Sequence, residues 1–244
     1  MSGNPFTPID EAAGKRGLKV AVWGAEGSGK THFGLTFPQP IYVLDTEMGA
    51  TPLRRKFKDK TISVMDVINV DRSGEAWEGD DVSDVEQIME GINFLLDKPV
   101  EEQKGTIMID SASDMWSMIQ GYGKVKIFKL KPMDRLKQQW DWGPITKVHK
   151  DLFRRLLKSP YNLVVTGKAS EVYNGPNPTG VYTGRFQKDV PYLCDVMIKF
   201  EKRLVNKQVQ RRGVIEKCRM NGTLDGKMYP DLTYTMLYES IRGK

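Results

Sequence analysis

One eight-residue stretch near the start of the chain constrains the fold more than any other feature. Residues 24–31 read Gly-Ala-Glu-Gly-Ser-Gly-Lys-Thr and match the phosphate-binding pattern G-x-x-x-x-G-K-[ST] at every specified position. The apolar run 18–23 before this stretch is typical of a buried strand, and residues 31–35 after it are typical of a helix. A strand, a glycine-rich loop and a helix in this order predict a cradle for the phosphates of a nucleoside triphosphate.

The residue types in this stretch each have a chemical reason. Glycines allow the backbone to curl so that successive N–H groups point at a phosphate. Lys30 is predicted to reach the β- and γ-phosphates of ATP, and the Thr31 hydroxyl is predicted to bind Mg²⁺. The predicted nucleotide-binding residues form one run: Gly24, Ala25, Glu26, Gly27, Ser28, Gly29, Lys30, Thr31 and His32.

A second stretch predicts the partner of this loop at the metal. Residues 106–110 read Thr-Ile-Met-Ile-Asp, which is an apolar strand closed by an aspartate. This is a Walker B pattern, in which the carboxylate holds Mg²⁺. Because it follows a phosphate loop at about the expected separation, Asp110 is predicted to share the metal with Thr31.

The group that activates the attacking water is predicted to come from another strand. Many ATPases place a Glu directly after the Walker B aspartate, but Ser111 stands there in this chain. Glu47 follows the apolar strand 41–45 by two residues, at the carboxyl edge of the sheet where ligands bind in open α/β folds. Glu47 is therefore predicted to be catalytic, and a surface glutamate that caps a turn is the alternative.

Strand-like and helix-like segments alternate over the first two-thirds of the chain. This alternation predicts an α/β fold with a mainly parallel sheet flanked by helices. Segments 195–204 and 214–220 are predicted to form a C-terminal antiparallel hairpin at one edge of the sheet, and 169–190 is predicted to be a long loop. Residues 1–16 are expected to be a flexible leader, and residues 17–244 to be a single domain.

Composition limits the class of protein and the kinds of site. The 39% hydrophobic content and the mean hydropathy of −0.46 are typical of a soluble globular protein. No apolar run approaches the roughly 18 residues that span a bilayer, and the polar N-terminus does not match a signal peptide. The two cysteines, Cys194 and Cys218, are too few for a disulfide framework and indicate a reducing cytoplasm. Only two histidines argue against a zinc site.

Charge is distributed unevenly along the chain. Residues 1–120 carry 12 Lys and Arg against 20 Asp and Glu, whereas residues 121–220 carry 22 against 8. Such an asymmetry is typical of a protein with a polyanion-binding face. Solvated Lys and Arg on helix surfaces are the alternative.

Four motifs together resemble the core of the RecA/RadA-like ATPases. They are G-A-E-G-S-G-K-T at 24–31, L-D-T-E-M-G at 44–49, T-I-M-I-D-S at 106–111 and E-K-C-R at 216–219. A closer likeness is to the small phage ATPases of the Sak-type single-strand annealing group. The cues for that likeness are D-W-G-P-I at 141–145, L-V-V-T-G-K at 163–168 and G-R-F…D-V-M-I-K-F within 184–200. The resemblance spans about residues 18–220.

The resemblance implies a RecA-like P-loop NTPase core and roles for individual residues. A strand that ends D-x-E supplies the catalytic glutamate in this family, which carries over to Glu47. Two basic residues on a late strand reach the γ-phosphate of the neighbouring subunit, which carries over to Lys217 and Arg219. A solvated sheet edge is the alternative for that pair. One departure concerns the sensor position after the fourth core strand, which is a polar amide or His in the family and Gly167 or Lys168 here.

RecA-like proteins bind single-stranded DNA through loops that follow the later core strands. The segment 169–190 occupies such a place and combines aromatic with basic residues, as in sequence-neutral binding of single strands. The alternative is that Tyr182 and Phe186 only attach the loop to the core. The predicted DNA contacts are Tyr173, Tyr182, Arg185, Phe186 and Lys188, with Lys207, Arg211 and Arg212 at the tip of the late hairpin.

These features together predict a DNA-dependent ATPase of phage-type recombination. It is expected to bind single-stranded DNA as a homo-oligomer, a ring or a filament, with ATP at the subunit interfaces. A single-strand-binding protein is a further expected partner, a membrane is not, and the host cytoplasm is the expected location. The alternatives are a small P-loop kinase, a motor or loader ATPase of helicase or packaging type, and a nucleotide switch without catalysis.

Overall fold

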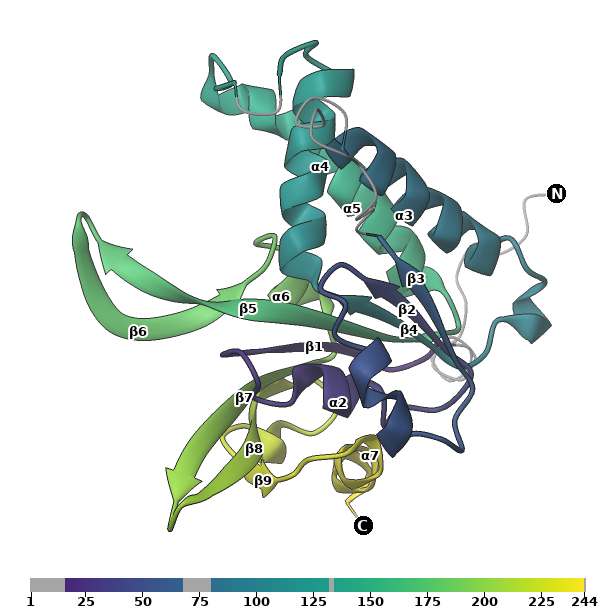
Figure 1. The fold of residues 1–244 in the computed structure, drawn as a ribbon, viewed down its shortest axis with the longest axis vertical. Coiled ribbons are helices and arrows are strands. Elements are labelled where there is room, and N and C mark those ends of the chain that lie inside the picture. The colour runs from purple at the N-terminus through teal and green to yellow at the C-terminus, as the bar shows by residue number, and fades with distance from the viewer. Residues whose placement is uncertain (1–15, 68–79, 132–133, 244) are drawn as a thin grey trace, which may run out of the picture.

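The computed structural model describes residues 16–67, 80–131 and 134–243 (Figure 1). Within these ranges the strands form a nine-stranded sheet with the order β3-β2-β4-β5-β1-β7-β8-β9, and β6 pairs with β5. The strands are β1 (Lys19–Gly24), β2 (Ile41–Asp45), β3 (Ile62–Asp66), β4 (Thr106–Asp110), β5 (Asn162–Asn174), β6 (Asn177–Arg185), β7 (Val196–Val205), β8 (Gln208–Cys218) and β9 (Met228–Pro230).

The strands from β3 through β2, β4, β5 and β1 to β7 run parallel to one another. Strand β1 lies between β5 and β7 and is buried along its whole length. The apolar run from Val20 to Trp23 fits this position, because a central parallel strand is covered on both faces. The carboxyl end of β1 therefore delivers the phosphate loop to the middle of the sheet edge.

Helices cover both faces of the sheet (Figure 1). Helices α3, α4 and α5 pack on one face, and α2 and α7 lie on the other. The helices are α2 (Lys30–Gly34), α3 (Asp80–Leu96), α4 (Ala112–Lys126), α5 (Trp142–Lys158), α6 (Val190–Leu193) and α7 (Tyr234–Arg242), with 3₁₀ turns at η1 (Thr51–Lys56), η2 (Val100–Glu102), η3 (Gln139–Asp141) and η4 (Gly222–Leu224).

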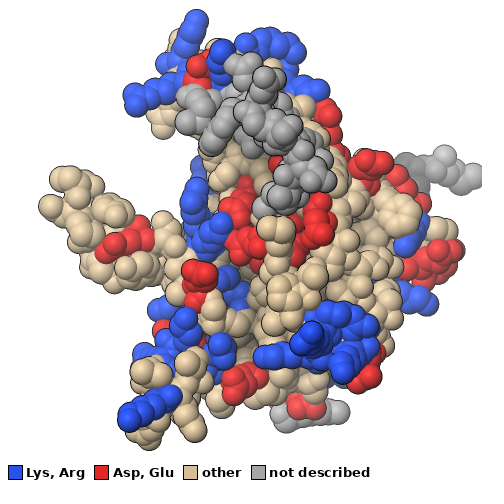
Figure 2. All heavy atoms as spheres, in the orientation of Figure 1, with Lys and Arg blue, Asp and Glu red and all other residues tan. Residues whose placement is uncertain are grey.

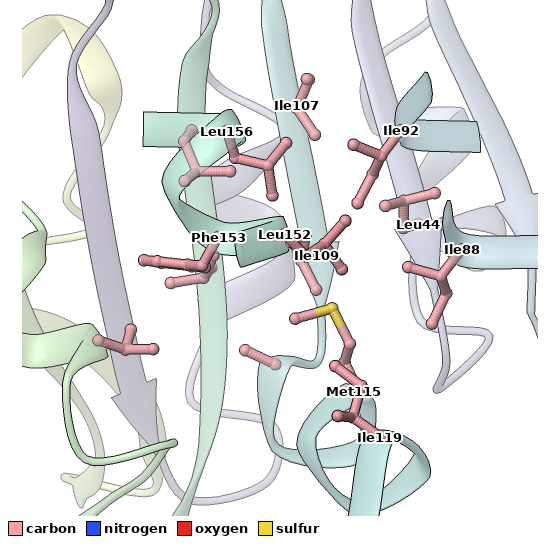
Figure 3. Packing of buried hydrophobic residues seen from close by; sticks show 14 of the residues in the cluster. Leu44, Ile88, Ile92, Ile107, Ile109, Met115, Ile119, Leu152, Phe153 and Leu156 are labelled. Atoms are coloured by element: carbon pink, nitrogen blue, oxygen red, sulfur yellow. The ribbon is translucent and has the colours of Figure 1, made fainter. Parts of the chain in front are cut away.

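Successive residues of β1 point to opposite faces and so belong to different hydrophobic clusters. Ala21 packs in the cluster under α3, α4 and α5, whereas Val20 and Val22 pack in the cluster beside α2 and α7. Figure 3 shows the first cluster, where Met115 of α4 and Phe153 of α5 meet the strand residues. The parallel sheet is thus the middle layer of three, as the alternation of strands and helices predicted.

Two antiparallel hairpins extend from the carboxyl edge on either side of the phosphate loop (Figure 1). We call residues 168–185 the β5–β6 arm, because Lys168 pairs with Arg185 at its base. We call residues 199–214 the β7–β8 hairpin, in which Lys199 pairs with Val214. The predicted antiparallel strands at the C-terminal end of the sheet are confirmed by β8 and β9.

Two expectations for these segments were wrong. The segment 169–190 is not mainly a loop, because β5 continues to Asn174 and pairs with β6 through a tight Gly175-Pro176 turn. The tip of the β7–β8 hairpin is Asn206-Lys207, whose φ angles of 50° and 64° suit a two-residue hairpin turn. Arg211 and Arg212 therefore lie along β8 and not at the tip.

Two further expectations concern the termini and the membrane. The expected leader at residues 1–16 lies outside the described residues, except for Arg16. Among the helices of the described ranges, none combines the length and the apolar character needed to cross a bilayer.

Candidate functional site

The phosphate loop has backbone conformations that require glycine. The φ angles of Gly24, Gly27 and Gly29 are 156°, 68° and 107°, in the region that other residues rarely adopt. A Cβ on Gly24 would lie 2.2 Å from the carbonyl oxygen of Phe200 on the neighbouring strand β7. The spacing of glycines in the sequence thus reflects both the curl of the loop and its close contact with β7.

The surroundings of Lys30 and Ser28 fit a bound anion. The Lys30 ammonium donates hydrogen bonds to the loop carbonyls of Gly24 at 2.9 Å and Ala25 at 3.1 Å. Burial lowers the pKa of Lys30 from its ordinary value. The Ser28 hydroxyl is buried and has no hydrogen-bond partner among the described residues. A buried polar group of this kind is expected where a ligand completes the hydrogen bonding.

Asp110 lies at the centre of a hydrogen-bond network at the end of β4. Its two carboxylate oxygens accept hydrogen bonds from the Thr31 hydroxyl at 2.6 Å and from the Thr166 hydroxyl at 2.5 Å. The side chain is fully buried, and burial raises its pKa. The hydrogen bonds oppose this rise, whereas the nearby carboxylates of Glu47 and Asp45 add to it. A cation at this carboxylate would be favoured, because it would offset the cost of a buried negative charge.

The pair of Thr31 and Asp110 fits Mg²⁺ better than it fits a transition metal. Both side chains offer oxygen, which is the ligand type of Mg²⁺, and a Mg²⁺ site uses few protein ligands with water and phosphate oxygens completing its shell. Within the described ranges, no group of three or more His, Cys, Asp or Glu side chains is placed to hold a metal ion by itself. Thr31 and Asp110 are therefore the residues that would hold the metal beside the phosphates.

Asp45 shapes the turn that presents Glu47. Strand β2 ends at Asp45, and its buried carboxylate accepts hydrogen bonds from the backbone N–H groups of Glu47 at 3.0 Å, Gly49 at 3.2 Å and Ala50 at 2.9 Å. These bonds fold the chain back at the end of the strand. The Glu47 side chain consequently lines the same cleft as Lys30.

Lys168 connects Glu47 to strand β5. Its ammonium lies 3.2 Å from Glu47 Oε1 and 2.8 Å from Asp114 Oδ1. Burial lowers the pKa of Lys168, but these two carboxylates outweigh burial and leave the pKa raised. Burial raises the pKa of Asp114, but hydrogen bonds from Lys168 and Ser111 outweigh it and leave that pKa lowered. Lys168 lies at the sensor position, where this chain departs from the pattern of the resembled family. There it forms an ion pair with Glu47, the candidate catalytic residue.

The phosphate loop forms the floor of a cleft with a volume of about 920 Å³. The walls come from the turn after β2, from the bases of both hairpins and from the segment after β9. Acidic and basic side chains therefore both line the cleft. The lining residues discussed in the text are Lys30, Thr31, Glu47, Lys168, Tyr182 and Arg211.

The predicted DNA-contact residues of the arm lie on a largely uncharged element. Tyr173 and Tyr182 are 60% and 52% exposed, so they do not attach the arm to the core. Tyr182 also lines the cleft. Residues 169–184 contain one acidic residue, Glu171, and neither Lys nor Arg. Figure 2 shows this arm as mostly tan at the left of the molecule.

Three further predicted DNA contacts lie at or beyond the base of the arm. Phe186 packs against the core, and its ring fills the space next to Gly167. This agrees with the alternative that Phe186 only attaches the segment to the core. The Arg185 guanidinium lies 3.4 Å from the Ser117 hydroxyl. Lys188 lines a separate hollow beside α5. The structure therefore does not gather the five residues of segment 169–190 on one surface.

The basic residues of the β7–β8 hairpin have separate surroundings. Lys207 lies in the exposed turn. Arg212 is paired with Glu201, with a distance of 2.8 Å between the charged groups. Arg211 Nε donates a hydrogen bond to the carbonyl of Gly27 at 3.0 Å, so this residue lies on the phosphate loop. Of these three residues, only Lys207 lies at the tip of the hairpin, where all three were predicted to lie.

Lys217 and Arg219 lie at the opposite edge of the sheet from the phosphate loop. Strand β8 runs antiparallel to β7, so the end of β8 lies near the amino ends of the parallel strands. Lys217 donates to the carbonyl of Pro191 at 2.5 Å, and Arg219 donates to the carbonyl of Tyr192. The pair cannot reach the loop of its own chain, and its predicted role toward a neighbouring subunit stays a prediction.

Three residues near the loop have contacts that sequence reasoning did not predict. They are Lys168 on Glu47, Lys202 on the loop carbonyl of Glu26, and Arg211 on that of Gly27. The only sequence signal was the position of Lys168 after a core strand. The contacts of the other two depend on the path of the β7–β8 hairpin.

Comparisons with known proteins agree with this geometry. A family model described as an AAA domain matches residues 16–221. No curated protein sequence matches the chain. Among solved structures, the fold is similar to the KaiC-like protein PH0186 of the hyperthermophilic archaeon Pyrococcus horikoshii OT3. That likeness has a TM-score of 0.50 and 18% identity, and covers 88% of this chain and 85% of the other. The chain belongs to this AAA-domain family and is a P-loop ATPase with a RecA-like fold.

Proposed function

We propose that this ATPase hydrolyses ATP in response to single-stranded DNA, in recombination of the kind carried out by small phage ATPases. The observation that carries the proposal is the ion pair between Lys168 and Glu47. Lys168 is the residue at which β5 leaves the parallel core and becomes the exposed arm. A ligand that moves the arm would therefore act directly on the group that handles the attacking water.

The residues of the cleft support a direct hydrolysis. The Glu47 carboxylate accepts a proton from the attacking water, whose oxygen forms a bond to the γ-phosphorus as the bond to the β-phosphate oxygen breaks. Lys30 and the loop N–H groups stabilise the negative charge on the phosphates. Mg²⁺ held by Thr31 and Asp110 supplies further charge neutralisation when it is bound. ADP and inorganic phosphate are the products.

The two hairpins support the assignment of single-stranded DNA as the partner. Exposed Tyr173 and Tyr182 on the arm are suited to stack on bases, and the β7–β8 hairpin carries cations suited to phosphates. Both elements leave the sheet on the side of the phosphate loop, one on each side of β1. A strand that contacts both hairpins would pass close to the ATP site.

The same proposal includes assembly into an oligomer with ATP between subunits. Lys217 and Arg219 cannot act on their own loop, so any role at a phosphate must be in a neighbouring subunit. Both side chains donate to backbone carbonyls, which are uncharged. Breaking these hydrogen bonds would therefore leave no buried charge without a partner. A single-strand-binding protein is a further proposed partner, because such a protein covers the same substrate.

The test is the rate of phosphate release from ATP with and without a single-stranded oligonucleotide. We expect the oligonucleotide to raise kcat several-fold, and a duplex of the same sequence to raise it less. An unchanged rate would contradict the recombination proposal while leaving the ATPase assignment intact. Transfer of phosphate to a nucleoside or small metabolite would instead indicate a kinase.

A further inference from the structure

Two cations of the β7–β8 hairpin lie on the phosphate loop of the same chain. Lys202 Nζ donates a hydrogen bond to the carbonyl oxygen of Glu26 at 3.3 Å. Arg211 Nε donates to the carbonyl oxygen of Gly27 at 3.0 Å. The two acceptors are consecutive loop carbonyls, so the hairpin holds one short piece of the loop with two positive charges.

The register of the hairpin explains why these two residues meet the loop. Lys202 and Arg211 are directly opposite each other on β7 and β8, so their side chains share a face. Phe200 is on the same face two residues earlier, and its ring packs on Phe33 of α2 at a centroid distance of 5.2 Å. The hairpin is thus anchored beside the loop at Phe200, two residues before Lys202.

The other face of the hairpin has a different set of contacts. Glu201 lies there and is paired with Arg212, Lys199 and Arg203 at distances of 2.8, 3.1 and 3.5 Å. The carboxylate of Glu201 thus offsets part of the positive charge on this face of the hairpin. The cations on the loop face instead bind backbone carbonyls, so their charge is not cancelled by a carboxylate among these contacts.

The glycines of the loop leave space for the hairpin cations. A Cβ on Gly27 would lie 3.2 Å from Lys202 Nζ, and a Cβ on Gly29 would lie 3.3 Å from Arg211 Cδ. Both distances are tighter than an ordinary van der Waals contact. The loop and the hairpin are therefore fitted to each other at both positions.

The bound carbonyls determine where the loop N–H groups point. In a trans peptide the C=O and N–H bonds point in opposite directions. A cation that binds the Gly27 carbonyl therefore fixes the Ser28 N–H on the opposite side of that peptide, where it donates to the Ala25 carbonyl at 3.3 Å. By the same geometry, Lys202 on the Glu26 carbonyl fixes the Gly27 N–H on the opposite side of its peptide. A loop whose peptides are fixed in this way is suited to bind phosphate through its backbone N–H groups.

We propose that Lys202 and Arg211 are a cis-acting pair of positioning residues for the triphosphate. They hold the loop in its phosphate-binding shape and add two positive charges beside it. The pair is separate from Lys217 and Arg219, which lie at the other edge of the sheet. The inference rests on the proposed binding of ATP at this loop.

The test compares the full-length protein with Lys202→Ala, Arg211→Ala and the double variant. Lys227→Ala is the control, because it removes one exposed charge from the β8–β9 turn and Lys227 does not line the cleft above the phosphate loop. Since the pair stabilises the loop in the ground state and the transition state alike, we expect KM for ATP to rise and kcat to stay within about twofold. For two partly exposed charged contacts, the Kd of a fluorescent ATP analogue should rise about five- to tenfold in the double variant.

Limited proteolysis and a charge-conserving variant test the same pair without catalysis. ATP should slow trypsin cleavage after Lys207 in the wild type and less so in the double variant, because only the wild type connects the hairpin to the occupied loop. Lys202→Arg with Arg211→Lys should restore most of the affinity. If the double variant does not fold, Lys202→Gln alone should still raise Kd.

Two results separate failure of this inference from failure of the proposed function. A wild-type protein that does not bind ATP would overturn both. A wild-type protein that binds and hydrolyses ATP, with a double variant no weaker than Lys227→Ala, would overturn the inference about Lys202 and Arg211 alone. A fall in kcat at unchanged KM would also overturn it, because that pattern indicates a transition-state contact.

Discussion

The β5–β6 arm and the β7–β8 hairpin are similar in topology and opposite in chemistry. Each begins as a parallel strand paired with β1 and then continues beyond the sheet as an antiparallel hairpin. Residues 169–184 of the arm carry one acidic residue and neither Lys nor Arg, whereas residues 199–212 of the hairpin carry six basic residues and one acidic residue. Exposed tyrosines and basic side chains are therefore divided between the two.

The difference extends to what each element contacts in the cleft. The arm starts at Lys168, which is paired with Glu47 and so with the proposed proton acceptor. The hairpin contacts the phosphate loop through Lys202 and Arg211. In the proposed mechanism, one element is thus connected to the chemical step and the other to the binding of the triphosphate. Changes on the arm side should alter kcat, and changes on the hairpin side should alter affinity.

The largest effect is expected for Glu47→Gln. The amide keeps the shape of the side chain but cannot accept the proton of the attacking water, so kcat should fall by about 10²–10⁴-fold. ATP binding should persist, because Lys30 and the loop are unchanged. Phosphate release and binding of a fluorescent nucleotide measure the two quantities. Turnover at the wild-type rate would remove Glu47 from the mechanism.

Lys168→Met should have the next largest effect, and mainly on kcat. The variant keeps the length of the side chain but no longer positions Glu47, and a misplaced catalytic group should cost between about tenfold and hundredfold. Stimulation by single-stranded DNA should be lost with it. A rise in KM without a change in kcat would contradict the division between the two elements.

The pH dependence of unfolding provides a control for the same variant. The lowered pKa of Asp114 means that its carboxylate stabilises the folded state above the unfolded pKa, and that this contribution is lost as pH falls through the folded pKa. Lys168→Met should therefore be less stable than the wild type at neutral pH, and the difference should shrink in acid. Denaturant titrations at both pH values measure it.

A smaller effect should distinguish the two elements in DNA binding. Tyr173→Ala on the arm should weaken binding of single-stranded DNA at least about fivefold without changing its salt dependence, because stacking releases no counterions. Lys207→Asn on the hairpin should lower the slope of log K against log salt by about 0.7. Asn tolerates the φ of 64° at this position. Equal slopes for both variants would contradict the division of roles.

The smallest expected effect concerns His32. Removal of the Arg211 charge in Arg211→Ala should raise the pKa of His32 toward its ordinary value, although burial and Lys56 still lower it. Because a lowered pKa favours the neutral folded state, folding gains stability as pH rises from the folded pKa to the unfolded one. Arg211→Ala should narrow the pH range between the folded and the unfolded pKa of His32. NMR titration of the ring, assigned with His32→Asn, measures the change in pKa. An unchanged pKa would contradict an effect of the Arg211 charge on His32.

Much of the fold and part of the site were predictable from local patterns. The buried strands have continuous apolar runs, and the loop at 24–31 has a pattern whose glycines serve the backbone directly. Thr31 and Asp110 were predicted to share a site and are joined by a hydrogen bond. Glu47 was predicted at the binding edge and lines the cleft. These features are predictable because each depends on residues next to one another or on strand ends that meet at one edge.

The hairpins were misjudged because their structure comes from pairing. The segment 169–184 contains glycines, prolines and polar residues that locally resemble a loop, and it becomes strand because β5 and β6 pair with each other. Phe186 has an aromatic ring of the kind that stacks on bases, but in the structure the ring packs against Gly167. Neither result is visible in a short window of sequence, because both depend on partners that the fold brings together.

The sequence by itself determined that this chain has a phosphate loop, an aspartate at the end of a buried strand beside it and a sheet to carry them. The tertiary structure decided which distant side chains complete the site. β5 lies between β1 and β4, which brings Lys168 to Glu47, and β7 lies on the other side of β1, which brings Lys202 and Arg211 to the loop. The physical reason is that strand order, register and side-chain alternation set these distances, and they arise only when the whole sheet has formed.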